Sequence, residues 1–161
     1  MIGRRRALVS PGLAIVLLFL ANCATVRDES VLTPRQAVER AADSAPAGVH
    51  AIFEMPVLAA GRDNGRIFLN SERDYRDQRN LSLSIGPQAA AGLTRRHGAP
   101  PDVFFPGKRV RVTGAAARVR INFFSQGRLT DLYYYQTHVA IQSADQITVL
   151  GSSSRRPRPQ S

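Results

Sequence analysis

The segment 71–80 holds the most concentrated set of side chains that could bind a ligand. Three arginines recur there at three-residue spacing and flank one tyrosine: Arg73, Tyr75, Arg76 and Arg79. Guanidinium groups donate hydrogen bonds to phosphate oxygens, and a tyrosine ring can stack on a base or a sugar. The segment also contains three acidic residues, so its charges cancel. Two interpretations remain open: a phosphate-binding loop, and a surface loop that pairs its own charges.

A second set of candidate contacts lies between residues 109 and 135. Arginines alternate with apolar residues at positions 109, 111, 118 and 120, and aromatic residues follow at 123, 124 and 133–135. Cationic rows beside aromatic rings are typical of surfaces that bind single-stranded nucleic acid. A solvated strand whose charges protect a sheet edge would show the same alternation. We take Arg118, Arg120 and Tyr134 as candidate ligand contacts, together with the four residues of segment 71–80.

Catalytic and metal-binding patterns are weak in this sequence. The three histidines, His50, His97 and His138, are isolated and lack metal-ligand spacing, and no glycine-rich phosphate loop precedes a helix. Ser71, Asp74 and His138 could be combined into a triad, but the sequence around the serine is not that of a nucleophile elbow. We therefore expect a non-enzymatic protein with no cofactor and no metal site.

Period-two alternation of apolar and polar residues predicts the strands that position these groups. The first strand begins at Val49, and Pro56 marks an edge or a bulge in it. Further strands are predicted at residues 66–70, 81–85, 135–141 and 146–150. The alternating runs 109–114 and 118–123 form either one strand bent at Gly114 or two paired strands.

Two short helices are predicted between these strands and before them. Thr33 can cap a helix that starts at Pro34 and continues through an alanine-rich stretch to residue 42. A second alanine-rich stretch, residues 88–96, is predicted to be helical and to stop before Gly98 and the Pro100-Pro101 pair.

The predicted order is three strands, one helix and then more strands, which is the order of the OB-fold, a five-stranded and partly open barrel. Four stretches add detail: IFLN at 67–70, NLSLSI at 80–85, GKRVRVTG at 107–114 and QITVL at 146–150. With them the chain resembles exported bacterial OB-fold modules of the nucleic-acid-binding-like type, some of which accompany nuclease domains. The resemblance covers roughly residues 49–150 and implies a mainly β protein, a five-stranded OB-fold-like barrel with one or two short helices. The long segment 115–134 departs from those modules, in which the corresponding hairpin is tight.

The N-terminus has the layout of an export signal. Arginines at positions 4–6 precede an apolar run from Ala7 to Ala21, which is interrupted by Pro11 and is short for a transmembrane helix. The run ends in LANC, residues 20–23, which resembles the lipobox of bacterial lipoproteins apart from Asn22, where a small residue is usual. The resemblance implies that Cys23 is lipidated and tethers the protein to a membrane. Ordinary signal-peptidase cleavage is the alternative.

The chain therefore divides into a signal peptide (1–22), a tether (23–32), an OB-fold-like domain (33–150) and a disordered basic tail (151–161). The formal net charge is +10, but three arginines lie in the leader and three in the tail. The remaining 16 basic and 12 acidic side chains give a net charge of about +4. Such a surface is only mildly basic, which weakens the case for a strong polyanion binder.

We expect an exported envelope lipoprotein, anchored on the periplasmic side and at the outer membrane rather than the inner one, because Ala24 replaces the aspartate that signals inner-membrane retention in some lipoproteins. Its binding module is expected to take single-stranded nucleic acid or another extended polyanion. The alternative is a structural lipoprotein that docks on an envelope protein through its tyrosines.

Overall fold

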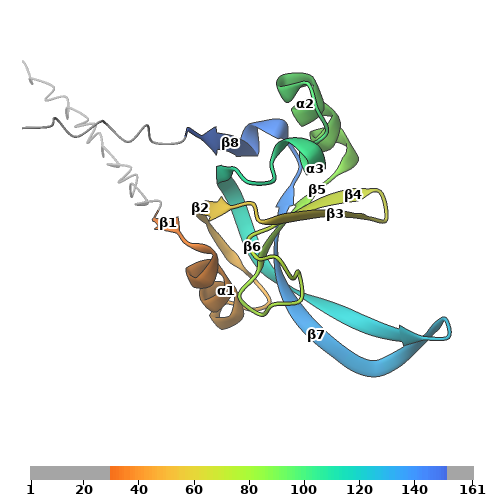
Figure 1. Ribbon diagram of the computed structural model, residues 1–161. Coiled ribbons are helices and arrows are strands. Elements are labelled where there is room, and N and C mark those ends of the chain that lie inside the picture. Colours follow the sequence, from red (N-terminus) through yellow and green to blue (C-terminus); the bar gives the residue numbers. More distant parts are fainter. Residues whose placement is uncertain (1–29, 152–161) are drawn as a thin grey trace, which may run out of the picture.

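The computed structural model describes residues 30–151 (Figure 1). The predicted signal peptide, Cys23, most of the tether and nearly all of the basic tail lie outside these residues. Strands account for 49% and helices for 23% of the described structure, which confirms the prediction of a mainly β protein. No helix among residues 30–151 is both long enough and apolar enough to cross a bilayer.

Eight strands form one mixed sheet. They are β1 (Val31–Leu32), β2 (Val49–Pro56), β3 (Ala59–Asp63), β4 (Arg66–Asn70), β5 (Leu81–Ile85), β6 (Arg109–Ser125), β7 (Arg128–Ile141) and β8 (Ile147–Leu150). Their order is β1-β2-β6-β7-β5-β4-β3, and β8 also pairs with β6. The pairs β1–β2 and β5–β7 are parallel, and the others are antiparallel. Within residues 30–151 no ladder joins the two ends of this order, so the sheet is open and not a closed barrel.

The two strands β2 and β3 replace the single first strand that the alternation predicts. Val57 and Leu58 separate them. The backbone N–H of Val57 donates to the carbonyl of Lys108, just before β6 (2.8 Å), and that of Leu58 donates to the carbonyl of Asn70 in β4 (2.9 Å). Pro56 is the last residue of β2, as expected for a residue without an N–H donor. The chain thus passes directly from β2, which pairs with β6, to β3, which pairs with β4.

The strands β6 and β7 form a long hairpin that projects from the body of the molecule (Figure 1). Residues 109–125 are one continuous strand, which decides between the two arrangements predicted for the runs 109–114 and 118–123. Gln126 and Gly127 turn the chain with φ values of 49° and 76°, and the ladder register shifts between Asn122 and Phe124. The long segment 115–134 is this hairpin, so β7 begins seven residues before the predicted start at Tyr135.

Short helices flank the sheet (Figure 1). Helix α1 (Pro34–Asp43) starts at the predicted position, where Thr33 and Gln36 form a capping box. Helix α2 (Pro87–His97) ends at Gly98, which has a φ of 75° and adopts the left-handed conformation that glycine tolerates. Helix α3 (Pro101–Phe104) was not predicted, because the proline pair reads as a stop signal. Proline is equally suited to the first position of a helix, and here it starts α3. The 3-10 turn η1 (Ala144–Gln146) precedes β8.

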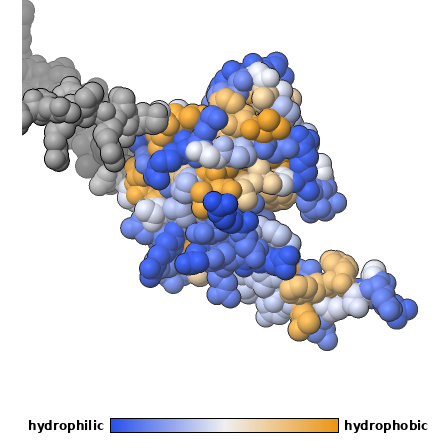
Figure 2. Space-filling model, in the orientation of Figure 1, coloured by the Kyte–Doolittle hydropathy of each residue, from blue (hydrophilic) through white to orange (hydrophobic). Residues whose placement is uncertain are grey.

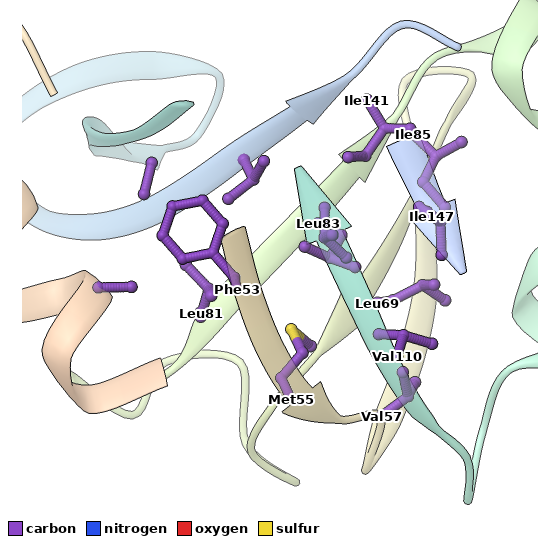
Figure 3. Close-up of a cluster of buried hydrophobic side chains, with 14 of the residues drawn as sticks. Phe53, Met55, Val57, Leu69, Leu81, Leu83, Ile85, Val110, Ile141 and Ile147 are labelled. Carbon is purple, nitrogen blue, oxygen red and sulfur yellow. The ribbon is translucent and has the colours of Figure 1, made fainter. Parts of the chain in front are cut away.

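The core lies between the inward faces of the strands and the helices that cover them (Figure 3). Its largest fully buried side chains include Phe53 and Met55 of β2, Leu81 and Leu83 of β5, and Phe105 after α3. Burying side chains of this size stabilises the fold by about 1.5–3 kcal/mol each relative to exposure. This core fixes which residues of each strand face outward.

Candidate ligand-binding groove

An open groove with a volume of about 520 Å³ lies on the outward side of the sheet. Residues 59–63 of β3, which include Arg62 and Asp63, form one wall, and segment 71–80 contributes Arg73 and Tyr75. The hairpin contributes residues 121, 134, 136 and 138, while Phe68 of β4 and Ser82 of β5 lie between. We call this set of residues the sheet groove.

The strand alternation explains why the groove residues face outward. Leu69 and Val139 are completely buried, so their neighbours Phe68 and His138 point to the opposite side of the sheet. The parallel pairing of β5 with β7 places Ser82 opposite His138. The rings of Phe68 and His138 lie 5.7 Å apart at an angle of 58°. Two residues that are 70 positions apart in the sequence therefore supply adjacent rings.

A buried network of amide and hydroxyl groups holds segment 71–80 against the sheet. Asn80 Nδ2 donates to Asn70 Oδ1 (3.1 Å) and to the Tyr75 carbonyl (3.3 Å), and Ser82 Oγ donates to the same Asn70 oxygen (2.8 Å). The backbone N–H of Leu81 donates to the hydroxyl of Ser71 (2.8 Å) in the same network. Because an unpaired buried polar group is costly, this network favours one conformation of the segment.

Gln136 connects the segment to the hairpin. Its Nε2 donates to the Tyr75 carbonyl and to the Tyr134 hydroxyl, both at 3.1 Å, and its Oε1 lies 2.7 Å from His138 Nε2. The amide oxygen can only accept, so His138 Nε2 carries the proton in this contact. One amide thereby positions two tyrosines and a histidine around the groove.

Two groove residues have shifted pKa values. Burial, followed by the nearby Arg66 guanidinium, lowers the pKa of His138 from 6.5, so the ring is neutral at pH 7. Burial is also the main reason that the pKa of Tyr134 is raised above 10. Both side chains therefore contribute uncharged rings and hydrogen-bonding groups to the groove at neutral pH.

The cationic residues at the groove differ in their partners. No acid among residues 30–151 lies within ion-pair distance of Arg73, whereas Arg62 binds both carboxylate oxygens of Asp102 at 2.7 Å. Arg76 lies beside the groove, over the ring of Tyr75, with its guanidinium carbon 5.2 Å from the ring centre and its Nε 3.9 Å from Asp74 Oδ1. Of the two arginines that line the groove, Arg73 is therefore the one whose donors remain available to an anion.

Arg79 does not line the sheet groove. It binds the carboxylate of Asp77 through Nε (3.0 Å) and a terminal nitrogen (2.7 Å). These hydrogen bonds, together with one from the Arg79 backbone N–H, lower the pKa of Asp77 to about 2. The interpretation of segment 71–80 as a self-paired loop thus describes Arg79 and, through a longer contact with Asp74, Arg76. Arg73 has no such partner among residues 30–151.

Arg118 and Arg120 lie on the opposite face of the hairpin from Tyr134. The guanidinium carbon of Arg118 lies 4.0 Å from the centre of the Tyr135 ring, and that of Arg120 lies 4.0 Å from the centre of the Tyr133 ring. We call these four residues the Arg–Tyr ladder. Of the seven predicted contacts, Arg73, Tyr75 and Tyr134 line the sheet groove, and Arg76 lies beside it over Tyr75. Arg79 pairs with Asp77, and Arg118 and Arg120 belong to the ladder.

Phe68, Gln136 and His138 are among the groove residues that the sequence did not indicate as ligand contacts. Alternation in 135–141 does place Gln136 and His138 on the face opposite Thr137, Val139 and Ile141. Nothing local shows that this face adjoins Phe68, because the contact depends on the parallel β5–β7 pairing.

Neither the Ser71–His138–Asp74 triad nor a cluster of metal-binding side chains is assembled in the described residues. Ser71 Oγ bonds with Asn80 and Leu81, whereas His138 Nε2 bonds with Gln136, so the triad that the sequence allows is not connected by hydrogen bonds. Residues 30–151 contain no group of three or more histidine, cysteine or acidic side chains placed to hold a metal ion.

No protein-family model matches the chain, and no curated protein matches it either. Among solved structures, 80% of the chain is similar to part of a chain assigned as an aspartyl-tRNA synthetase from Leishmania major Friedlin. The TM-score is 0.39 and the sequence identity is 10%, and the similarity covers 22% of that chain. A likeness of this size supports no argument about function.

Proposed function

We propose that residues 33–150 form a non-enzymatic, OB-fold-like module that binds a short stretch of single-stranded nucleic acid in the sheet groove. The strand pairing supports the fold assignment when β2 and β3 are taken together as one bent first strand. That strand pairs with β4 and with β6, and β5 pairs with β7, which gives the five strands of a partly open barrel. The strands β1 and β8 are additions at the periphery of this arrangement.

The position of the groove agrees with this assignment. OB-folds bind oligonucleotides and oligosaccharides on the face of their second and third strands, between the loops that join strands one to two and four to five. In this chain those elements are β4, β5, the turn at Asn64-Gly65 and the β6–β7 hairpin. The sheet groove is lined by residues from β4, β5 and that hairpin.

The observation that favours nucleic acid is the gathering of four rings beside an unpaired arginine. Phe68, Tyr75, Tyr134 and His138 line the groove together with Arg73. Unpaired bases can stack on such rings, whereas the bases of a duplex stack on one another and are not accessible. Arg73 in the groove, and Arg76 beside it over the Tyr75 ring, are the groups proposed to contact the backbone phosphates.

Fluorescence-anisotropy titration of a labelled single-stranded oligonucleotide with the full chain tests this proposal. About two phosphate contacts predict that log affinity falls with log salt at a slope of about −1.4. Tyr75→Ala should weaken binding by about 5- to 150-fold, the range expected for the loss of one stacked base. Arg79→Ala is the matched control and should leave the affinity unchanged, because its partner is Asp77.

The outcomes separate the two functions considered for this chain. Absence of binding at low salt would reject the nucleic-acid proposal and favour docking on an envelope protein. Binding that Arg79→Ala and Tyr75→Ala weaken equally would place the ligand outside the sheet groove.

We further propose that the chain is an exported lipoprotein, anchored through Cys23 on the periplasmic side and at the outer membrane rather than the inner one. The support is the arginine-led apolar run and the LANC sequence at residues 20–23. Metabolic labelling with a radioactive fatty acid should mark the wild-type chain, and Cys23→Ala should abolish the label. Labelling of the Cys23→Ala variant would reject lipidation at this residue.

A further inference from the structure

The end of the β6–β7 hairpin exposes bulky apolar side chains that the core does not use. The exposed fractions are 47% for Phe123, 68% for Phe124, 62% for Leu129 and 68% for Leu132. We call residues 123–132 the hairpin end. Figure 2 shows apolar residues gathered near the end of the projecting hairpin, with hydrophilic residues at its outermost turn. Because these side chains do not stabilise the core, their exposure favours an interaction role.

The Arg–Tyr ladder lies on the same hairpin, between this end and the body of the protein. No acid among residues 30–151 forms an ion pair with Arg118, Arg120 or Arg128. Asp131 is the single acidic residue in the sequence from 109 to 141. Stacking on a ring covers one face of a guanidinium but leaves its in-plane N–H donors available to an anion.

A partner must satisfy both the apolar hairpin end and the cationic ladder. A nucleic acid would contact the arginines but would leave Leu129 and Leu132 facing water. An apolar protein surface would cover the leucines but would desolvate Arg118 and Arg120 without counterions. A bilayer that contains anionic lipid offers both an apolar interior and a negatively charged surface.

We propose that the β6–β7 hairpin is a contact site for anionic lipid bilayers. The apolar side chains of the hairpin end enter the boundary between headgroups and acyl chains, and the outermost polar turn stays among the headgroups, which requires the hairpin to lie along the surface. Tyr133 and Tyr135 then lie at headgroup depth, where tyrosine is enriched in membrane proteins, and Arg118 and Arg120 contact lipid phosphates.

This contact is separate from the proposed nucleic-acid site. Tyr134 and Gln136 face the sheet groove, whereas the ladder residues Tyr133 and Tyr135 alternate with them and face the other side. Within the hairpin end, Phe123 lies beside Tyr134, with ring centres 5.5 Å apart, so the separation is between the groove and the ladder.

The sequence contains no tryptophan, so a single introduced tryptophan reports on one position in the full chain. We would compare Phe124→Trp with Val103→Trp, whose native side chain is 69% exposed on α3, away from the hairpin. The probes are vesicles of phosphatidylcholine alone and of phosphatidylcholine mixed with phosphatidylglycerol, each with and without brominated acyl chains. Binding of the apolar N-terminal run to vesicles would tether both variants equally, so only a difference between the reporters identifies the hairpin.

The expected result is that mixed vesicles shift the Phe124→Trp emission to shorter wavelength and that brominated lipid quenches it. The Val103→Trp emission should change in neither respect. Adding Arg118→Gln and Arg120→Gln to the Phe124→Trp chain should raise the concentration of brominated mixed vesicles that gives half of the quenching by about 30-fold, since each arginine near an anionic surface contributes roughly fivefold.

Three outcomes would overturn the proposal. The first is a Phe124→Trp emission that stays at the wavelength of an exposed tryptophan in the presence of mixed vesicles. The second is an equal response of the two reporters. The third is a response of Phe124→Trp to single-stranded oligonucleotide but not to vesicles, which would assign the hairpin end to nucleic-acid binding.

Discussion

At the scale of single residues, neighbours decide which of the similar arginines remain available to a ligand. Segment 71–80 contains the pattern Asp-x-Arg twice, and each aspartate accepts a hydrogen bond from the backbone N–H two residues later, Asp74 from Arg76 and Asp77 from Arg79, both at 2.9 Å. Only Arg79 also binds its aspartate with two guanidinium nitrogens. The sequence indicates the local turns, because aspartate favours them. Which arginine side chain also binds its aspartate depends on the conformation of the folded segment, which the sequence does not reveal.

This difference predicts a selective change in the titration of Asp77. Arg79→Ala removes the side-chain hydrogen bonds that contribute most to the lowered pKa, so the pKa should rise from about 2 toward its ordinary value of 3.8. The rise should be incomplete, because the backbone N–H at position 79 still donates to the carboxylate. NMR titration of the side-chain carboxyl carbon measures it, with Arg73→Ala as the control.

The sign of the linked effect on stability follows from the same shift. A carboxyl whose pKa is lowered in the folded state stabilises the fold above the unfolded value of 3.8, and this contribution is lost as the pH falls toward 2. If Arg73→Ala raises the pKa of Asp77 as much as Arg79→Ala does, the assigned partner is wrong.

At the scale of elements, local sequence patterns identified most strands and helices but not which strands pair with one another. Alternation and turn residues correctly placed β4 and β5, and capping residues placed the start of α1. The first seven residues of β7, at the outer end of the β6–β7 hairpin, were not predicted to be a strand. Residues 128–134 face solvent on much of their surface, so the apolar alternation that marks a half-buried strand is absent there.

The crossing of β6 over the core depends on the absence of a side chain at position 114. A Cβ atom added to Gly114 would lie 2.8 Å from Val139 Cγ1 and 3.4 Å from Gln146 Nε2. Val139 is completely buried and cannot move away freely. Gly114→Ala should therefore destabilise the fold by about 1–3 kcal/mol, the usual cost of overpacking.

Urea unfolding followed by circular dichroism measures this loss, and Gly61→Ala provides the control. Gly61 is also in a strand, but a Cβ atom there would meet nothing within 4 Å. Replacing a strand glycine by alanine without a clash should be neutral or slightly stabilising. Equal destabilisation by the two substitutions would show that steric contact with Val139 does not limit position 114.

At the scale of the whole molecule, one hairpin separates two surfaces of different chemistry. Its groove side presents Tyr134 and Gln136 beside β4 and β5, and its other side presents the Arg–Tyr ladder. The sequence indicated residues of both surfaces, but we predicted Arg118 and Arg120 to act together with Tyr134. Their separation follows from the β6–β7 register, which pairs Arg120 with Tyr135 and Ile121 with Tyr134.

This arrangement predicts that the two proposed ligands bind without competition. Tyr75→Ala should weaken oligonucleotide binding and leave the quenching of Phe124→Trp by brominated mixed vesicles unchanged. Leu129→Ser should reduce that quenching and leave oligonucleotide affinity unchanged. Saturating oligonucleotide should not change the quenching of Phe124→Trp, because the groove and the ladder lie on opposite sides of the hairpin. If oligonucleotide instead abolishes the quenching, both ligands use one face of the hairpin, and the separation of the groove from the ladder does not extend to function.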